Sequence, residues 1–512
     1  MRFRKLSPLA MLAVLAAAAP LWSAIPARKA PPAAAAKAPA PRERAVKTQG
    51  EAVIGGQTLH YTATAGTLLL YGPKHQPTAS VFYIAYTENG ANPVQRPLTF
   101  AYNGGPGGAS ALVDVGGFGP RRIVWPGVNQ IAQELPPYQI VNNPDSIFSA
   151  TDLVFIDAVG TGYSRILKAG NPKMFYGVRQ DGQAFKQFIE RYISVNRRWN
   201  SPKFLLGESY GTTRNAVTAN DLVSDGVYLN GVIMCSTVLQ FPTIWGASGD
   251  DLPFDLYLPS YAAAAYEHHR LNPRPASLQA AVNAAEQYAK GEYWLALYQG
   301  DRISPARKQA VAQRLAQLTG IPVALWLKVN LRLPLSVFMR RLMGPDGPMI
   351  GRYDARFMTP EMQPLMPFST GGASGASTTK IWGALTASFN DYLENTLHYT
   401  STRPYTQLSF VVNRDWAFNY PGRMGDTVGP AMARAMNNDP GMQLMMNNGY
   451  YDMATPFYAT RYSIAHMGLV PSLEKNVHWY YYPVGHMLYV NPKALPALAK
   501  NIDAFIAHAD AK

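Results

Sequence analysis

The sequence predicts an α/β fold with a mostly parallel central sheet, interrupted by a helical insertion. Short apolar runs bounded by Gly, Pro or Asn are typical of buried strands, and they span residues 81–86, 98–102, 153–156, 204–206, 232–234, 444–446 and 478–482. Helical patterns lie between some of these runs, at residues 181–193 and 215–223. Because strands that alternate with helices form parallel sheets covered on both faces, we expect a layered α/β core.

Between about residues 246 and 400 the pattern becomes helical and strand runs become rare. Helix-like segments span residues 276–290, 305–318 and 381–397. We interpret residues 246–400 as a helical cap inserted into the core. The core then consists of a first part, residues 48–245, and a second part, residues 401–512.

The N-terminal residues have the features of a secretory signal peptide. A basic segment at residues 2–5 precedes an apolar segment at residues 6–22, and small residues follow at 23 and 24. This pattern predicts a signal peptide over residues 1–24, with an uncleaved N-terminal anchor as the alternative. Residues 25–47 are mostly Ala, Pro, Lys and Arg, which predicts a flexible linker. No later stretch is apolar and long enough to span a membrane.

Charge and cysteine content narrow the class of protein. The 512-residue chain has a net charge of +14, of which residues 1–50 supply +8, from nine Lys or Arg and one acid. The remaining charge forms no basic, aromatic-interleaved segment, so nucleic-acid binding is not predicted. Cys235 is the only cysteine and lies in an apolar run, which predicts a buried thiol and no intramolecular disulfide. With the signal peptide, this favours export to a bacterial periplasm or the extracellular space.

The segment Gly207-Glu208-Ser209-Tyr210-Gly211 has the pattern of a nucleophile elbow. It follows an apolar strand run and precedes a helical pattern, so the serine lies on a tight strand-to-helix turn. Glycines on both sides allow strand and helix to approach closely. Ser209 is therefore the candidate nucleophile.

A serine nucleophile requires a base and a carboxylate that orients the base. Asp452 and His486 each follow a predicted strand, in the order Ser, Asp, His that suits such a sheet. The competing residues are in the helical region, inside a strand run, or after a weaker strand: His268, His269, His398, His478 and Asp415. We therefore predict a catalytic triad of Ser209, Asp452 and His486.

The glycine-rich loop 103–108 follows the strand run 98–102 and suits an oxyanion site. Backbone N–H groups of Gly105 and of Tyr210, the residue after the nucleophile, are the two candidate donors. A phosphate-binding loop is not indicated, because the loop has neither a G-K-[ST] ending nor G-x-G-x-x-G. No metal-ligand motif is present either, so we predict neither a cofactor nor a metal.

These motifs together resemble the serine carboxypeptidase family of the α/β-hydrolase fold, most closely its bacterial secreted branch. The matching segments, in family order, are residues 103–107, 156–164, 207–211, 448–452 and 485–487. The resemblance extends from about residue 50 to the C-terminus. It implies that Asn103 and Glu208 bind the C-terminal carboxylate of a peptide substrate, with the adjacent N–H of Gly104 as a further donor. Glu208 can take part only by sharing a proton with that carboxylate.

The chain departs from the family pattern at two glycines. Gly108 stands where many members have Cys, and Gly117 aligns with a Glu that supports the carboxylate network. The second departure leaves strict C-terminal specificity open. The expected function is an exported serine-type carboxypeptidase that cleaves C-terminal residues from peptides through an acyl-enzyme. An esterase or acyltransferase with the same triad is the alternative, followed by a non-catalytic envelope binding protein on a hydrolase scaffold.

Overall fold

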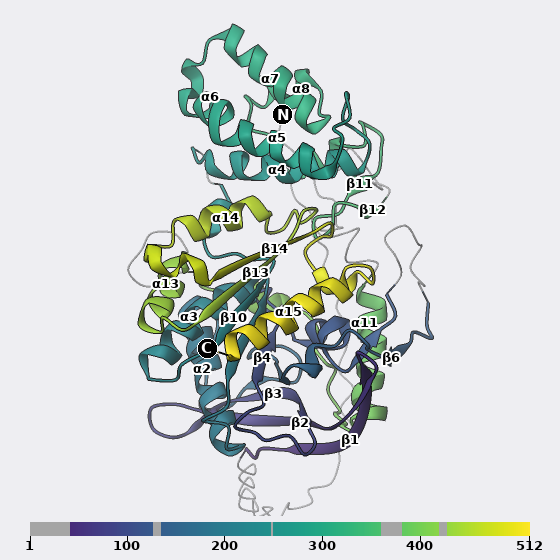
Figure 1. The fold of residues 1–512 in the computed structure, drawn as a ribbon, viewed down its shortest axis with the longest axis vertical. Helices are drawn as coiled ribbons and strands as arrows, with labels where there is room; N and C mark the ends of the chain where they lie inside the picture. The colour runs from purple at the N-terminus through teal and green to yellow at the C-terminus, as the bar shows by residue number, and fades with distance from the viewer. Residues whose placement is uncertain (1–40, 126–134, 247–248, 360–380, 419–426, 512) are drawn as a thin grey trace, which may run out of the picture. The chain divides into compact units, whose positions relative to one another are not determined.

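A mixed, mostly parallel sheet forms the centre of the fold (Figure 1). The computed structural model describes residues 41–125, 135–246, 249–359, 381–418 and 427–511. The main path of the sheet has the order β1-β2-β3-β7-β4-β9-β10-β13-β14, and from β7 to β14 all neighbours are parallel. These strands are β1 (Ala45–Ile54), β2 (Gln57–Tyr71), β3 (Pro77–Glu88), β4 (Leu98–Tyr102), β7 (Asp152–Ile156), β9 (Lys203–Glu208), β10 (Gly231–Cys235), β13 (Gln443–Gly449) and β14 (Val477–Tyr482).

Each predicted apolar run lies within one of these strands, so the predicted α/β class with a mostly parallel sheet is confirmed. The structure adds an antiparallel edge, in which β1 pairs with β2 and β2 pairs with β3. Ala45 to Lys47, which the sequence analysis assigned to the linker, pair with residues 64–66 of β2. The first half of β1 is partly exposed and polar, which explains why it has no apolar signal.

Helices cover both faces of the sheet because side chains of successive strand residues alternate between two cores. In β9, Leu205 belongs to the core under α2 (Val178–Val195), α3 (Tyr210–Ser224) and α13 (Gly429–Asn438). Phe204 and Leu206 belong to the opposite core, under α15 (Leu495–Asp510) and α11 (Trp382–Asp391). The strands are therefore buried on both faces, as their near-continuous apolar sequences predict.

Residues of the predicted helical insertion form a third hydrophobic cluster, together with a few residues of the second core part. Its helices are α4 (Leu252–Glu267), α5 (Leu278–Tyr288), α6 (Trp294–Gln299), α7 (Pro305–Thr319), α8 (Val323–Lys328) and α9 (Leu335–Arg341). The apolar helix α4 contacts both α5 and α7 and lies at the centre of this cap. Ser304 caps the N-terminus of α7, and Gly320 ends it in a left-handed conformation, so local sequence sets both ends of this helix.

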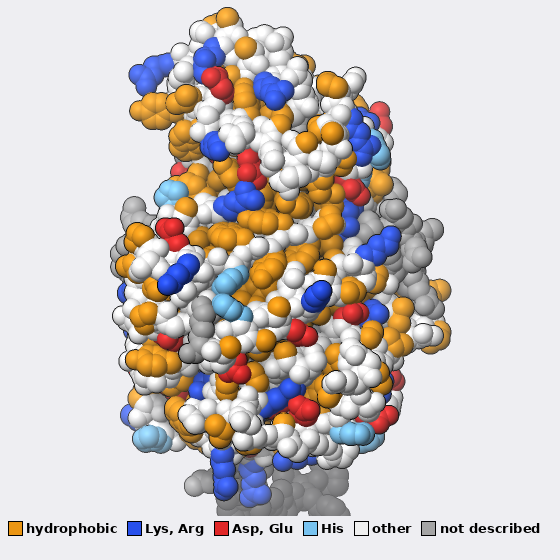
Figure 2. All heavy atoms as spheres, in the orientation of Figure 1, with side chains coloured by type: hydrophobic (Ala, Val, Ile, Leu, Met, Phe, Trp, Pro, Cys, Tyr) orange, Lys and Arg blue, Asp and Glu red, His pale blue; other side chains and the backbone are white. Residues whose placement is uncertain are grey.

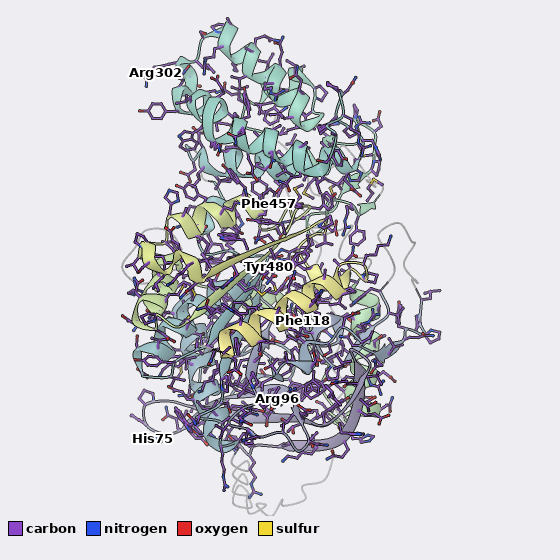
Figure 3. All side chains as sticks on the ribbon, in the orientation of Figure 1. His75, Arg96, Phe118, Arg302, Phe457 and Tyr480 are labelled. Atoms are coloured by element: carbon purple, nitrogen blue, oxygen red, sulfur yellow. The ribbon has the colours of Figure 1, made fainter. Side chains whose placement is uncertain are left out.

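The cap packs directly onto α14 (Phe457–Ala465), a helix of the second core part. Phe457, labelled in Figure 3, is fully buried in the same cluster as Tyr261 of α4. Figure 2 shows hydrophobic side chains gathered on the molecular surface between the cap helices and α14. Cap and core thus share one apolar cluster, which also includes residues 450, 451 and 453 of the loop after β13.

Helix α11 belongs to the core rather than to the cap. Leu385 and Phe389 are buried in the core cluster that contains α15, and Phe389 packs against Tyr405 with ring centroids 4.8 Å apart. The helical pattern of residues 381–397 continues that of the insertion, and for this reason the segment is predicted as part of the cap. In the structure, the buried insertion residues of the cap cluster all lie between Tyr257 and Ala355, and so before α11.

The predicted signal peptide and linker residues 25–40 lie outside the described residues. Within the part of the chain that the structure describes, no helix combines the length and hydropathy of a membrane span. Cys235 is buried, as its apolar neighbours predict.

Candidate active site

Ser209 lies at the turn between β9 and α3 and has a strained backbone. Its φ is 60° and its ψ is −129°, a combination that non-glycine residues rarely adopt. The turn is held by hydrogen bonds from Ser209 N to Cys235 O (2.9 Å) and from Thr212 N to Ser209 O (2.8 Å). A Cβ atom at Gly207 would lie 2.3 Å from Gly211 O, so this turn requires glycine. These features place the Ser209 side chain at the carboxyl edge of the sheet.

Asp452 and His486 meet at the same edge, on the loops after β13 and β14. Asp452 Oδ2 lies 2.8 Å from His486 Nδ1. The other oxygen of Asp452 accepts hydrogen bonds from Ala454 N (2.7 Å) and Thr455 N (2.9 Å), and the Thr455 hydroxyl donates to Oδ2 (2.7 Å). Since an ionised carboxylate only accepts, Nδ1 carries the proton of this pair and Nε2 is left to act as a base.

The Nε2 atom of His486 faces Glu208 in this structure. Glu208 Oε1 lies 3.3 Å from Nε2. No hydrogen bond joins His486 to Ser209 among the described residues, although both line the same cavity. Burial acts to lower the pKa of His486, but the carboxylates of Asp452 and Glu208 outweigh it, and the net pKa is raised. The imidazole of His486 therefore lies between two carboxyl groups, with Nδ1 next to Asp452 and Nε2 next to Glu208.

Glu208 is a buried acid with several polar partners. Its Oε2 accepts a hydrogen bond from Asn103 Nδ2 (2.9 Å), and the Gly104 N–H donates to the same carboxylate. Burial raises the pKa of Glu208, and this effect exceeds the opposing effects of His486 and of the two donors. Glu208 therefore keeps its proton to a higher pH than an ordinary glutamate.

A cavity of about 90 Å³ joins most of the predicted residues. Its walls include Ser209 and His486 together with Asn103, Gly104, Gly105 and Glu208. Asp452 and Tyr210 do not line it and are buried behind it. The remaining wall residues are Gly108, Ala109, Leu112, Tyr353, Trp382, Leu385, Gln407, Leu408 and Met487. The cavity is small, polar at its base and apolar toward α11.

The predicted oxyanion donors lie where the loop after β4 passes over the turn. A Cβ atom at Gly104 would lie 2.3 Å from Tyr210 N, so the two backbones are in direct contact. Gly105 has a φ of +117°, which strongly favours glycine. The loop is closed by a hydrogen bond from Gly108 N to Gly104 O (3.0 Å). Gly104, the neighbour of Gly105, is thus in contact with the backbone of Tyr210.

The competing residues are engaged elsewhere. His478 Nε2 lies 3.1 Å from Gln443 Oε1 in the sheet, and His268 Nε2 bonds Ala355 O in the cap. Asp415 pairs with its neighbour Arg414 on the surface. Among the residues that the structure describes, no group of three or more His, Cys, Asp or Glu could hold a metal ion.

Two residues of the site were missed by the sequence analysis. Thr455 bridges the pair, because its hydroxyl bonds Asp452 and lies 3.1 Å from His486 Nδ1. Tyr489 is fully buried, and its hydroxyl accepts a hydrogen bond from Asn103 Nδ2 (3.0 Å). Both follow a predicted site residue by three positions, which is the only local signal that could have indicated them.

Tyr489 also explains the glycine at position 117. A Cβ atom at Gly117 would lie 2.6 Å from Tyr489 Cβ. A longer side chain at this position would therefore displace the tyrosine that supports Asn103. In this chain Tyr489 and Gly117 fit together where the family pattern has an acid at position 117.

Residues 63–226 match the family model described as serine carboxypeptidase. The matched range extends from β2 to the end of α3 and contains the loop after β4 and the turn at Ser209. The predicted resemblance to the serine carboxypeptidase family is thus confirmed. The match supports a serine-type carboxypeptidase, whereas assignment to the bacterial branch stays a prediction.

The structural comparison confirms the fold. Kex1(delta)p, a prohormone-processing carboxypeptidase from Saccharomyces cerevisiae, is similar over 88% of this chain and 92% of its own, with 15% identity and a TM-score of 0.58. A proline iminopeptidase from Mycobacterium smegmatis is similar over 87% of this chain and 98% of its own, with 13% identity and a TM-score of 0.37. No curated protein matches the chain. The predicted α/β-hydrolase fold is confirmed by the first of these structures.

Replacing Gly117 with Ala tests the fit between Gly117 and Tyr489. The added methyl group should push Tyr489 from its position and lower the free energy of unfolding by about 1–3 kcal/mol, as overpacking does. Denaturant unfolding of the full chain measures this. Gly291→Ala is the control, because a Cβ atom there meets nothing within 4 Å. Equal stability of the two variants would contradict the proposed tight contact.

Proposed function

We propose that this enzyme removes C-terminal residues from peptides through a Ser209–His486–Asp452 triad. The observation that carries the proposal is the group formed by Asn103, Gly104 and Glu208, which lines the same cavity as Ser209. In this structure Asn103 and Gly104 donate to Glu208, and a substrate's terminal carboxylate would compete for these donors beside an acid whose pKa is raised. A peptide held there by its end presents its last peptide bond to the nucleophile.

The proposed reaction gives each of these groups one role. Ser209 Oγ attacks the carbonyl carbon while His486 Nε2 takes the hydroxyl proton, and Asp452 stabilises the resulting imidazolium. The N–H groups of Gly105 and Tyr210 stabilise the oxyanion. His486 then donates its proton to the departing amino group, which leaves an ester on Ser209. Water hydrolyses that ester with His486 as base and regenerates the serine.

Glu208 binds the terminal carboxylate in its neutral form. Two carboxylates in a buried site cannot both ionise without strong repulsion, so one proton is shared between them. Asn103 and the Gly104 N–H hold Glu208 in place, and Tyr489 in turn holds the Asn103 amide. An esterase or acyltransferase would not need this group, because its substrates have no such terminal acid.

Labelling with a fluorophosphonate tests the nucleophile. Wild-type protein should react at Ser209, and Ser209→Ala should lose both labelling and activity, the latter by a factor of order 10⁴ or more. Ser164→Ala is the matched control, because the Ser164 hydroxyl is buried and bonds Phe82 N and Asp157 O. Labelling that persists in Ser209→Ala and disappears in Ser164→Ala would overturn the assignment. Absence of labelling in the wild type would favour the non-catalytic alternative.

The pH dependence of peptide cleavage tests the role of Glu208. For blocked dipeptides with a free C-terminus, KM should rise as the pH rises through the raised pKa of Glu208, because the ionised acid repels the substrate. Amidated dipeptides should show no such rise and should react about tenfold or more slowly at acidic pH, since they lack the charge-assisted contact. Equal rates on both substrates across the pH range would exclude the carboxylate site.

Two variants separate the effect of Glu208 ionisation from the effect of the Tyr489 contact to Asn103. Glu208→Gln keeps a hydrogen-bond donor but cannot ionise, so the rise in KM should disappear. In the free enzyme the same change removes an anion from His486, so the acidic limb of kcat/KM should move to lower pH. Tyr489→Phe should raise KM for free-carboxylate substrates without changing the pH at which KM rises. An unchanged pH profile in Glu208→Gln would contradict the proposed role of this acid.

We further propose that the protein is exported across a bacterial membrane and acts on peptides in the periplasm or outside the cell. The support is the sequence of residues 1–24, which has the three segments of a signal peptide. N-terminal sequencing of the protein recovered from each cell fraction should find a mature chain that begins within the predicted linker. A chain that retains Met1 in the membrane fraction would favour the uncleaved anchor.

A further inference from the structure

A second cavity, larger than the first, lies between the cap and α14. Its volume is about 350 Å³, within the range of small-molecule sites. Helices α4 and α6 and the turn between α5 and α6 form one side, and α14 forms the other. The two cavities share no lining residue. This cavity is therefore not part of the proposed active site.

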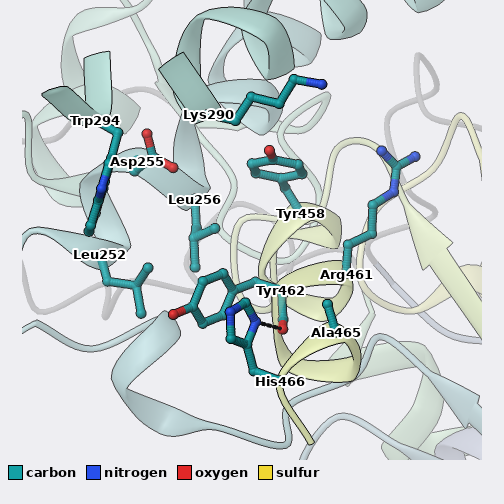
Figure 4. Close-up of a pocket in the computed structure, with 10 residues that line it drawn as sticks. All are labelled: Leu252, Asp255, Leu256, Lys290, Trp294, Tyr458, Arg461, Tyr462, Ala465 and His466. Atoms are coloured by element: carbon teal, nitrogen blue, oxygen red, sulfur yellow. Dashed lines mark hydrogen bonds between the residues drawn. The ribbon is translucent and has the colours of Figure 1, made fainter. Parts of the chain in front are cut away.

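The cavity has apolar and aromatic walls. Leu252 and Leu256 come from α4, Trp294 from α6, and Tyr458 and Tyr462 from α14. Figure 4 shows Asp255 and Trp294 at one side of the cavity, Lys290 and Arg461 at the other side, and Tyr458 between them. Such walls suit an aromatic or branched aliphatic group rather than a polar one.

Asp255 is the exceptional residue of this cavity. Its side chain is only 6% exposed, and its Oδ1 atom is buried without a hydrogen-bond partner among the described residues. A buried carboxylate oxygen without a donor costs free energy, which a donor from a ligand would recover. Burial alone raises the pKa of Asp255 to about 7, so a positive partner would favour its ionised form.

The basic side chains of the cavity do not neutralise Asp255. Arg461 is held by Glu286 Oε1 (2.7 Å) and donates to the Tyr481 hydroxyl (2.6 Å). No ion pair joins Asp255 to Arg461 or to Lys290 among the described residues. His466 Nδ1 lies 2.7 Å from Tyr462 O within α14. The acid therefore faces an apolar space with no cation of the described chain against it.

We propose that this cavity binds the ammonium group of an amine that carries an aromatic or branched aliphatic side chain. The ammonium group donates to Asp255, and the side chain packs against Leu256, Trp294 and Tyr458. Two sources share this chemistry, a free amino acid and the N-terminal residue of a peptide. If the ligand is a free amino acid, its carboxylate would bind Lys290, which lies across the cavity from Asp255. Binding in this cavity does not require Ser209, so this proposal and the proposed function can be tested independently.

Calorimetric titration of the full chain with phenethylamine tests the proposal. Saturable binding is expected, and phenethyl alcohol, which has the same ring without the charge, should bind about tenfold or more weakly. Asp255→Asn should weaken phenethylamine binding by a similar factor. Glu292→Gln is the matched control, since Glu292 lies on the same turn as Lys290 but pairs with Arg307 outside the cavity. Thermal unfolding of each variant checks that it is folded.

Two further comparisons make the result decisive. Trp294→Ala removes a cavity wall that is 40% exposed and should weaken binding of the aromatic amine even if Asp255→Asn fails to fold. Tighter binding of phenylalanine than of phenylalaninamide would identify free amino acids as the ligand, and the reverse order would identify peptide N-termini. Ser209→Ala should bind as the wild type does. Absence of phenethylamine binding, or equal binding by wild type, Asp255→Asn and Trp294→Ala, would overturn the proposal.

Discussion

The close approach of three backbone segments around Ser209 is the constraint on which the rest of the site depends. The loop after β4, the end of β9 and the start of α3 meet with no space for side chains, because Cβ atoms at Gly104, Gly207 and Gly211 would lie 2.3–3.0 Å from backbone atoms. This contact aims the Ser209 side chain and brings the two candidate oxyanion donors together. This contact requires a strained backbone at Ser209, and the surrounding packing must offset the free energy of that strain.

A buried ion pair supplies part of that support. Arg214 of α3 is fully buried, its Nε bonds Asp181 of α2 (2.7 Å), and its Nη1 donates to Asn103 O (2.8 Å). Removing one member would leave the other as an uncompensated buried charge, which is strongly unfavourable. The pair thus connects α2 and α3, two helices of the same layer, to the loop that presents the Asn103 amide. Placement of the proposed substrate-binding group depends on helix packing as well as on the loop sequence.

Local motifs made most of the sheet predictable, because each apolar run marks a strand within a few residues. Local motifs also indicated Ser209, Asp452 and His486 as candidates, each just after a predicted strand. The sequence could not indicate contacts between distant segments. Tyr489 supports Asn103 from 386 positions away, and α11 packs on the core although its pattern resembles that of the cap helices. The edge strand β1 was missed because its partly exposed, polar face has no apolar run. Tertiary packing, rather than local propensity, decides all three.

Glu208 and His486 are best regarded as two sites that compete for one proton. With Oε1 and Nε2 3.3 Å apart, the pair can hold the proton on the imidazole, as an ion pair, or on the acid, as a neutral pair. Only the neutral pair leaves Nε2 able to accept the proton of Ser209. A substrate carboxylate beside Asn103 and Glu208 adds negative charge nearer to Glu208 than to the imidazole, and so favours the acid as the site of the proton. On this argument a terminal carboxylate both binds the substrate and prepares the base.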